Sequence, residues 1–313
     1  MLIKSPSVYL LAILCAMMVT PAQATLVARA FVASYGLNTN TATNCADVIN
    51  PCRHLSVAVD FVDTNGEVVV LDSGNYGLVT LTRSISLTAA PGVYAGMTAG
   101  TGRSGVIINP GTVNVVLRGL TINGLGGDNG VLMNSNGNLS IENCVISNFS
   151  GVGQHGVLVS SDATVRMVDT LVRDNYRGIQ LQGGGVTDIS GSKFLGNNDT
   201  AILATSTSAP FPAVVISDTI VTSGGTGIEA ISSGTGSARI SMIRSSVTNN
   251  LKGVASSASA GIAPVTLSES MVAGNLVGYF VGAGGLINSL LNNTITGNTG
   301  NTGSLTTLLG GLQ

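Results

Sequence analysis

The chain has 313 residues, of which 42 are glycine and none is tryptophan; only 9% are charged, and the formal net charge is −2. This balance lacks the basic patch that nucleic acid or an anionic membrane surface would require, so we expect no nucleic-acid partner. A glycine-rich, charge-poor composition also argues against helices with solvated faces and favours short strands joined by turns.

The first 24 residues predict an export signal peptide. Lys4 supplies the positive start, Val8 to Val19 form the apolar run, and Ala22-Gln23-Ala24 is a cleavage site of the A-x-A type. The run is too short to span a bilayer, and polar residues interrupt every later apolar stretch. We therefore expect an exported chain without a membrane span, located in the periplasm, on the cell surface or outside the cell.

Residues 25–66 are expected to form a strand, a disulfide loop and a helix. Leu26 to Ala33 alternates between apolar and polar residues like a strand. Asn50-Pro51 indicates a helix start, with asparagine as the cap and proline at the first position, and Asn65-Gly66 indicates its end. We expect this helix to cover the open end of the strands that follow, where a stacked fold would otherwise expose its core.

The cysteines predict one disulfide. Cys15 lies in the signal peptide, whereas Cys45 and Cys52 have six residues between them in a polar loop. In an oxidising compartment this pair is expected to be bonded. Cys144 occupies a turn position without a neighbouring base, which favours a small packed side chain over a nucleophile. No C-x-x-C motif or histidine cluster occurs, so we expect no metal site and no cofactor.

Residues 67–300 are expected to form the main domain. It begins with apolar runs at Val68–Leu71, Val79–Leu81, Ile85–Leu87 and Val106–Ile108. The stretch 90–104 is rich in glycine, alanine and threonine, which predicts a surface excursion.

From Leu117 to Asn298 a six-residue phrase recurs about every 25 residues, a period typical of a stacked solenoid. Each phrase ends in an apolar residue: Ile122, Ile146, Val172, Phe194, Val221, Val247, Val272 and Ile295. A second apolar position follows it: Val131, Val157, Ile179, Ile202, Ile228, Val254 and Tyr279. Valine and isoleucine interleaved with serine, threonine and glycine favour strands over a leucine-rich repeat. The pattern predicts an all-β parallel β-helix, a solenoid of roughly ten coils.

Two polar columns mark turns within each coil. The first holds residues that tolerate a left-handed backbone: Gly119, Asn143, Asp169, Gly191, Asp218 and Asn292. Arg244 and Glu269 interrupt it, which suggests coils with a differently shaped corner. The second column is Asn175, Asn197, Asn250, Asn275 and Asn298. It is either a ladder of stacked amides or a set of independent turn residues. Residues 301–313 lose the phrase, and Leu305, Leu308, Leu309 and Leu312 suggest a C-terminal tail or cap.

Three segments carry a resemblance to a known family. Asn75-Tyr76-Gly77, Ile85-Ser-Leu87 and Val116-Leu-Arg-Gly-Leu-Thr-Ile122 resemble bacterial secreted proteins of the right-handed parallel β-helix repeat family, with the pectin-lyase-like fold. The resemblance covers essentially the mature chain and implies a right-handed parallel β-helix, whose cap would be the short N-terminal α-helix predicted above from the residues. Members range from polysaccharide lyases and hydrolases to surface proteins without known chemistry, so the fold does not fix the function.

One set of polar residues is predicted to lie together. Asp128 and Asn129 precede Gly130, His155 precedes Gly156, and Arg177 precedes Gly178, at matching offsets in three successive coils. Stacking would place an acid, an imidazole and a guanidinium roughly 5 Å apart per step. We take Asp128, His155 and Arg177 as the candidate catalytic set, with Asn129 and Tyr176 as ligand-binding residues.

The same stretch resembles motifs of polygalacturonases. Gly153-Gln-His-Gly-Val157 is similar to their Gly-x-His-Gly motif, and Gly127-Asp-Asn-Gly130 to their Gly-Asp-Asp motif. The second aspartate is replaced by Asn129, and the Asn-Thr-Asp motif has no counterpart, so a carboxylate to activate water is missing. We therefore expect a structural, surface or glycan-binding role, with a polysaccharide or cell-surface glycan as partner. The alternative is a carbohydrate-active enzyme, a polygalacturonase-like hydrolase or a polysaccharide lyase, acting on an acidic polysaccharide.

Overall fold

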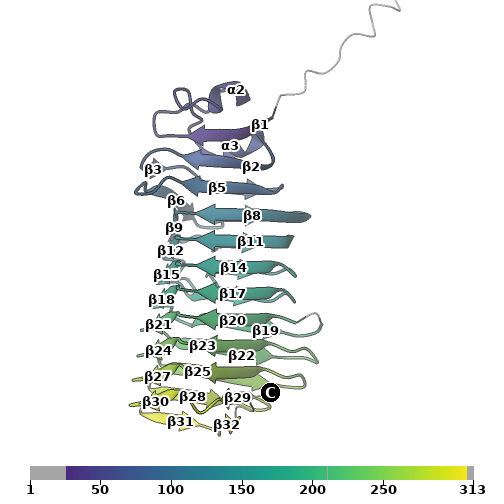
Figure 1. Ribbon diagram of the computed structural model, residues 1–313, viewed down its shortest axis with the longest axis vertical. Helices are drawn as coiled ribbons and strands as arrows, with labels where there is room; N and C mark the ends of the chain where they lie inside the picture. The colour runs from purple at the N-terminus through teal and green to yellow at the C-terminus, as the bar shows by residue number, and fades with distance from the viewer. Residues whose placement is uncertain (1–25, 210, 309–313) are drawn as a thin grey trace, which may run out of the picture.

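The computed structural model describes residues 26–209 and 211–308; the predicted signal peptide lies outside this range, as do Leu309 and Leu312. The chain winds into a right-handed column of three parallel sheets (Figure 1). Each coil gives one short strand to each sheet, as the repeat of valine and isoleucine predicts. Every strand then pairs with the equivalent strand of the next coil, so the all-β parallel β-helix is confirmed.

The three sheets hold twelve, ten and ten strands. Sheet A consists of β1 (Val27–Val32), β2 (Val62–Val70), β5 (Ile85–Ala89), β8 (Thr112–Arg118), β11 (Asn136–Glu142), β14 (Thr164–Val168), β17 (Val186–Ser190), β20 (Ala213–Ser217), β23 (Arg239–Ile243), β26 (Pro264–Ser268), β29 (Leu286–Ser289) and β32 (Thr306–Thr307). Sheet B consists of β3 (Gly74–Asn75), β6 (Ala95–Gly100), β9 (Leu120–Leu125), β12 (Val145–Ser147), β15 (Leu171–Arg173), β18 (Lys193–Leu195), β21 (Ile220–Thr222), β24 (Ser246–Thr248), β27 (Met271–Ala273) and β30 (Thr294–Thr296). Sheet C consists of β4 (Val79–Leu81), β7 (Ser104–Ile108), β10 (Asn129–Met133), β13 (His155–Val159), β16 (Arg177–Leu181), β19 (Thr200–Ser206), β22 (Thr226–Ser232), β25 (Lys252–Ala258), β28 (Val277–Val281) and β31 (Gly300–Thr302).

The core is made of apolar residues stacked in columns. Parallel pairing in register brings the same position of successive coils together, as with Ile141, Met167 and Ile189. The members of this column are 0–1% exposed: Leu117, Ile141, Met167, Ile189, Ile216, Met242 and Leu267. The apolar ends of the repeated phrases, from Ile122 to Val272, are buried in the same way, as the repeat predicts. At the C-terminal end, Tyr279 and Ile295 are only partly buried against the core.

The corner between sheets A and B has a left-handed backbone in coil after coil. Asn143, Asp169 and Asp218 have positive φ angles, as predicted. Arg244 (φ 46°) and Glu269 (φ 47°) have the same conformation, so the prediction of a differently shaped corner was wrong. Stacking on the neighbouring coils imposes the turn on residues that do not favour it. Arg244 also donates to Asp218 one coil away, at 2.9 and 3.0 Å.

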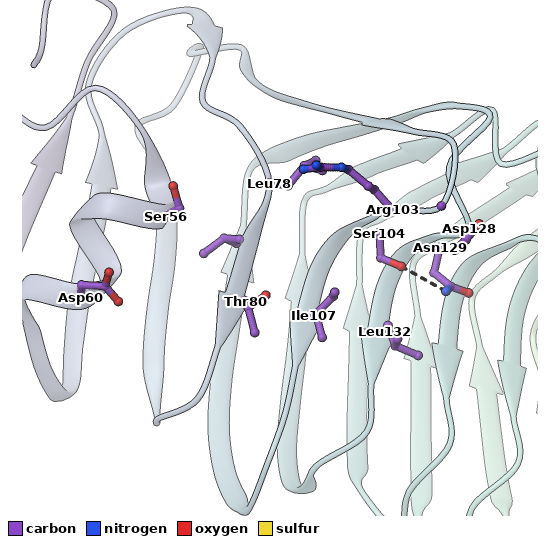
Figure 2. A pocket seen from close by; sticks show the side chains of 12 residues that line it. Ser56, Asp60, Leu78, Thr80, Arg103, Ser104, Ile107, Asp128, Asn129 and Leu132 are labelled. Atoms are coloured by element: carbon purple, nitrogen blue, oxygen red, sulfur yellow. Dashed lines mark hydrogen bonds between the residues drawn. The ribbon is translucent and has the colours of Figure 1, made fainter. Parts of the chain in front are cut away.

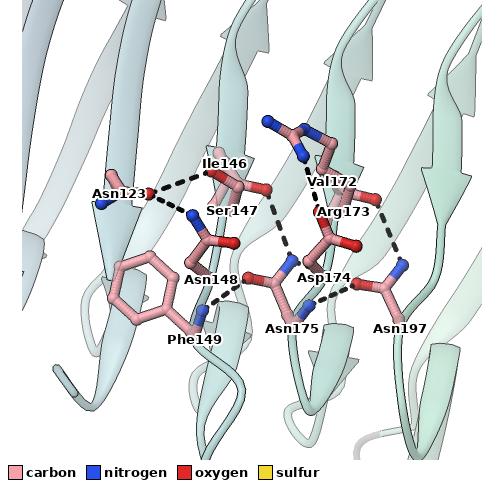
Figure 3. Close-up of polar contacts among 10 residues, drawn as sticks. All are labelled: Asn123, Ile146, Ser147, Asn148, Phe149, Val172, Arg173, Asp174, Asn175 and Asn197. Carbon is pink, nitrogen blue, oxygen red and sulfur yellow. Dashed lines mark hydrogen bonds and ion pairs between the residues drawn. The ribbon is translucent and has the colours of Figure 1, made fainter. Parts of the chain in front are cut away.

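The asparagine column forms an amide ladder (Figure 3). Asn175 Nδ2 donates to Asn197 Oδ1 at 3.1 Å and to the Ile146 carbonyl at 3.3 Å. Its own Oδ1 accepts from the Phe149 backbone N–H at 3.1 Å. The ladder resumes between Asn250 and Asn275, at 3.1 Å. Of the two interpretations left open by the sequence, stacked amides are therefore the correct one.

The N-terminal end carries two short helices, α2 (Ala42–Cys45) and α3 (Leu55–Phe61). Leu55, Ala58 and Val59 of α3 are buried, as its apolar face predicts. The predicted boundaries were wrong: His54 is the N-cap, and Asn65-Gly66 lies within β2. The reason is that Cys52 is held in extended pairing, its N–H donating to the Phe31 carbonyl at 2.9 Å. A disulfide joins Cys52 to Cys45.

One further segment differs from expectation. The glycine-rich stretch 90–104 is not a surface excursion, because β6 lies in sheet B with Ala95, Met97 and Ala99 buried. Small residues there alternate inward and outward as in any other strand. At the C-terminal end, β31 and β32 pair with β28 and β29 as the last strands of sheets C and A. Neither of the helices described here is long and apolar enough to cross a membrane.

Candidate functional site

A row of polar residues runs along the outer face of sheet C. Parallel register aligns the residue that begins each strand, giving Ser104, Asn129, His155, Arg177, Thr200, Thr226 and Lys252 on seven coils. The predicted alignment of His155 with Arg177 is thus present in the structure. The register partner of His155 on the preceding coil is Asn129, and Asp128 lies one residue before the row.

His155 is held at both ring nitrogens. It is 8% exposed, with Nδ1 3.1 Å from the Asn129 amide and Nε2 2.8 Å from Gln180 Oε1. Burial lowers the pKa of His155 below its ordinary value of 6.5, an effect that the Gln180 hydrogen bond opposes and the Arg177 charge reinforces. A neutral ring in this position orients its neighbours, and its lone pair is not directed at solvent as a general base requires.

Arg177 is fixed by three neighbours and still reaches solvent. Its Nε donates to Asp199 Oδ2 at 2.6 Å, and Nη1 donates to Gln180 Oε1 at 2.6 Å. The guanidinium carbon lies 5.5 Å from the centroid of the Tyr176 ring. The side chain is 27% exposed. Because a guanidinium has five N–H groups, those that remain can bind a carboxylate or hydroxyl group from outside.

A second polar group lies further along the row. Thr200 Oγ1 donates to Glu229 Oε2 at 3.2 Å. Burial raises the pKa of Glu229 above its ordinary 4.5, although the Thr200 hydrogen bond and the Lys252 charge act in the opposite direction. Lys252 Nζ lies 4.7 Å from the centroid of the Phe280 ring. The row therefore contains two cations, Arg177 and Lys252, each beside an aromatic ring.

Asp128 lies in a groove at the N-terminal end of the same face (Figure 2). The groove has a volume of about 580 Å³ and also contacts Asn129, Arg103 and Asp60. Asp128 is exposed, and its backbone carbonyl accepts a hydrogen bond from the His155 N–H at 3.0 Å. The five predicted site residues are therefore on one face, with the acid in the groove and the imidazole and guanidinium beyond it.

Sequence reasoning missed Gln180, Asp199 and Glu229. For two of them a signal existed, because Gln180 and Glu229 are polar residues between buried apolar ones, in Ile179-Gln-Leu181 and Ile228-Glu-Ala230. Asp199 carried no signal, since its contact depends on how the Arg177 side chain crosses to the next coil.

The described residues contain no exposed free cysteine and no cluster of metal-binding side chains. Cys144 is 1% exposed, and burial raises its pKa to about 11, which matches the predicted packed side chain. Across residues 26–209 and 211–308, histidine, cysteine and acidic side chains form no cluster of three that could hold a metal ion.

Comparisons with known proteins agree with the fold. The family model described as "Right handed beta helix region" matches residues 104–277, more than half of the chain. No curated protein matches the sequence. Among solved structures, an arginine-to-alanine variant of the PL6-family alginate lyase AlyGC is similar, with a TM-score of 0.56 and 14% sequence identity. The match covers 91% of this chain and 41% of that one, so the chain spans about two fifths of the lyase.

Proposed function

The chain belongs to the right-handed β-helix family, and on that scaffold we propose that the outer face of sheet C binds an acidic polysaccharide after export of the protein. The observation that carries the proposal is the Arg177 guanidinium, which Asp199, Gln180 and Tyr176 hold in place while part of it stays exposed. A preorganised guanidinium suits planar carboxylates such as those of uronic acids.

The spacing of the two cations supports a chain-like ligand. Arg177 and Lys252 are separated by three coils, or about 14 Å at the usual strand separation. Thr200 and Thr226 lie between them in the same row but are only 2% and 9% exposed, so the ligand would contact mainly the two cations and the rings beside them. Each coil advances by roughly the length of one sugar in an extended polysaccharide, so successive sugars would meet successive coils.

The aromatic rings support a sugar over other anions. Tyr176 lies beside Arg177 and Phe280 beside Lys252, and both rings are partly exposed. An aromatic face packs on the apolar face of a sugar ring while the adjacent cation binds its carboxylate. A small inorganic anion would use the cations but would gain nothing from the rings.

The alternative is a polysaccharide lyase, and Glu229 is the observation that favours it. β-Elimination transfers the C5 proton of a uronate to a base, breaks the C4–O bond while the departing oxygen takes up a proton, and forms a C4–C5 double bond; the base that the row offers is the partly exposed Asp199 carboxylate. A protonated carboxyl group can donate the proton that the departing oxygen needs, and burial favours the protonated form of Glu229. The likeness to an alginate lyase in fold is consistent with this reaction. A hydrolase is less well supported, because the row lacks a pair of acids flanking one bond.

The test compares binding and cleavage on the same material. We expect alginate or polygalacturonate, and not neutral dextran, to retard the protein in affinity electrophoresis. Arg177→Ala should weaken this binding by about tenfold or more, the equivalent of one charge-assisted hydrogen bond. Arg173→Ala is the matched control, because Arg173 is an exposed arginine on sheet B.

Two results would change the conclusion. Equal retardation by dextran, or none by either acidic polymer, would contradict the binding proposal. Ultraviolet-absorbing unsaturated products that Glu229→Gln abolishes would establish the lyase alternative.

A further inference from the structure

The groove at the N-terminal end of sheet C is closed on one side by a helix. β4 is the first strand of sheet C, and α3 stands beyond it, with Ser56 and Asp60 facing the groove (Figure 2). The floor is formed by Thr80, Ile107 and Leu132. Toward the other end the groove reaches Asn129, whose amide contacts His155, so it opens into the polar row.

The closed end is rigid because α3 is part of the core. Leu55 and Ala58 are 0% exposed, and the Leu55 N–H donates to the Tyr76 carbonyl at 3.0 Å. Just before the helix, Cys52 is held by its disulfide to Cys45. A polysaccharide lying along the row would therefore meet α3 as a fixed wall and could not continue past it along the same path.

The side chains at this wall differ from those of the row. Asp60 and Asp128 are exposed carboxylates, and Arg103 comes from the loop beside them. Carboxylates repel the uronate groups of an acidic chain but accept hydrogen bonds from hydroxyl groups. A terminal sugar has one hydroxyl more than an internal sugar, since one glycosidic bond is missing. Arg103 supplies a cation for the carboxylate of that sugar.

Because α3 closes the groove and Asp60, Asp128 and Arg103 line it, we propose that the groove holds the terminal sugar of an acidic polysaccharide. The protein would then recognise chain ends. This inference rests on the proposed function, because the same chain would continue from the groove over His155 and Arg177. Recognition of internal segments would instead require a groove open at both ends.

The stoichiometry of binding tests the inference. Alginate fractions of increasing defined length are titrated into the full protein by calorimetry, while ultraviolet absorbance checks that the chains stay intact. We expect a constant number of bound proteins per chain, whatever its length. Fractions with a chemically reduced reducing end, and fractions shortened from the non-reducing end to leave an unsaturated sugar, identify which end is held.

Variants at the wall complete the test. Thr80→Trp, at an exposed position on the floor, should fill the groove and weaken binding by at least about tenfold. Asp60→Ala should weaken it less, and Asp63→Ala, an exposed acid of β2, should have no effect. Binding that grows in proportion to chain length, and that needs Arg177 but tolerates Thr80→Trp, would overturn chain-end recognition and leave the proposed function standing. Absence of binding at every length would overturn both.

Discussion

His155 and Gln180 occupy neighbouring coils, and His155 Nε2 lies 2.8 Å from Gln180 Oε1. The same oxygen accepts from Arg177 at 2.6 Å, which fixes the orientation of the Gln180 amide. His155 Nε2 must then carry the proton. The structure has Asn129 Oδ1 at Nδ1 and Asn129 Nδ2 donating to Ser104 Oγ, so a neutral ring that accepts at Nδ1 requires the Asn129 amide to be turned over, with the Ser104 hydroxyl then donating to Oδ1. The imidazole thus links the groove to Arg177.

The first prediction concerns stability at mildly acidic pH. The pKa of His155 is lowered in the folded protein by burial, with Arg177 and Asp199 as the facing charges. The unfolded chain therefore binds a proton first as pH falls. The stabilisation from the neutral ring should be complete above about pH 6.5 and decrease as pH falls toward the folded-state pKa. Urea titrations of His155→Gln should lose this pH dependence, and those of His54→Gln should retain it. An unchanged slope in His155→Gln would refute the assignment.

The second prediction concerns the amide ladder. Asn250 Oδ1 accepts from the Gly224 N–H at 3.0 Å, and Asn250 Nδ2 donates to Asn275 Oδ1 at 3.1 Å. Asn250→Ala would leave buried backbone groups unpaired and should lower the free energy of unfolding by about 1–3 kcal/mol. Asn198→Ala, at an exposed position, is the control. Equal small losses in thermal unfolding of the two variants would mean that the ladder does not stabilise the fold.

The third prediction concerns the core column. Ile216 is 0% exposed, whereas its neighbour Val215 on the same strand is 44% exposed. Ile216→Ala should cost about 2–5 kcal/mol, the usual range for truncating a buried aliphatic side chain. Val215→Ala should change the free energy of unfolding far less. A loss below about half a kcal/mol for Ile216→Ala in urea titration would contradict the inward orientation.

The fourth prediction concerns the disulfide between Cys45 and Cys52. The closed loop is short, so the bond should stabilise the protein by only about 2–3 kcal/mol in the chain-entropy model. Replacing both cysteines by serine should lower the melting temperature accordingly. Mass spectrometry of the protein isolated without reductant should find Cys45 and Cys52 bonded to each other, and two free thiols would contradict the predicted disulfide.

The columns of the fold were predictable because each coil buries the same position against its neighbours. Ile189 and Ile216 stack in register, and such a contact leaves a period in the sequence. The backbone at Arg244 was not predictable, since stacking and the ion pair to Asp218 override the intrinsic preference of arginine. The helix start was misplaced for a similar reason: the strand pairing of Cys52 outweighed the local capping pattern at Asn50-Pro51.

The candidate site was predictable only in part. Because His155 precedes Gly156 and Arg177 precedes Gly178 at matching offsets in the repeat, the sequence predicted that the two residues would stack. The partnership of Arg177 with Asp199 depends on side-chain geometry that no repeat encodes. The groove depends on Asp60 in α3, which lies far from Asp128 in the sequence and outside the repeat. Contacts of this kind carry no periodic signature.

The last prediction concerns the pH dependence of polysaccharide binding. The pKa of Glu229 is raised by burial above 4.5, and the charged groups around it are Lys252, Asp199 and Arg177. Once deprotonated, Glu229 repels a uronate chain and competes with it for Lys252. Binding to alginate should therefore tighten as pH falls through the pKa of Glu229. Glu229→Gln should flatten this part of the profile and bind more tightly at neutral pH.

Glu67→Gln on sheet A is the matched control and should leave the profile unchanged. Protonation of His155 would also favour an anionic ligand, so the profile is measured in the His155→Gln background as well. The Glu229 contribution must survive there, because the two side chains lie on different coils and neither contributes to the pKa shift of the other, although both have Arg177 and Asp199 as charged neighbours. If Glu229→Gln left affinity and its pH dependence unchanged in both backgrounds, the polysaccharide would not pass over this carboxyl group, and the binding path would have to end before Lys252.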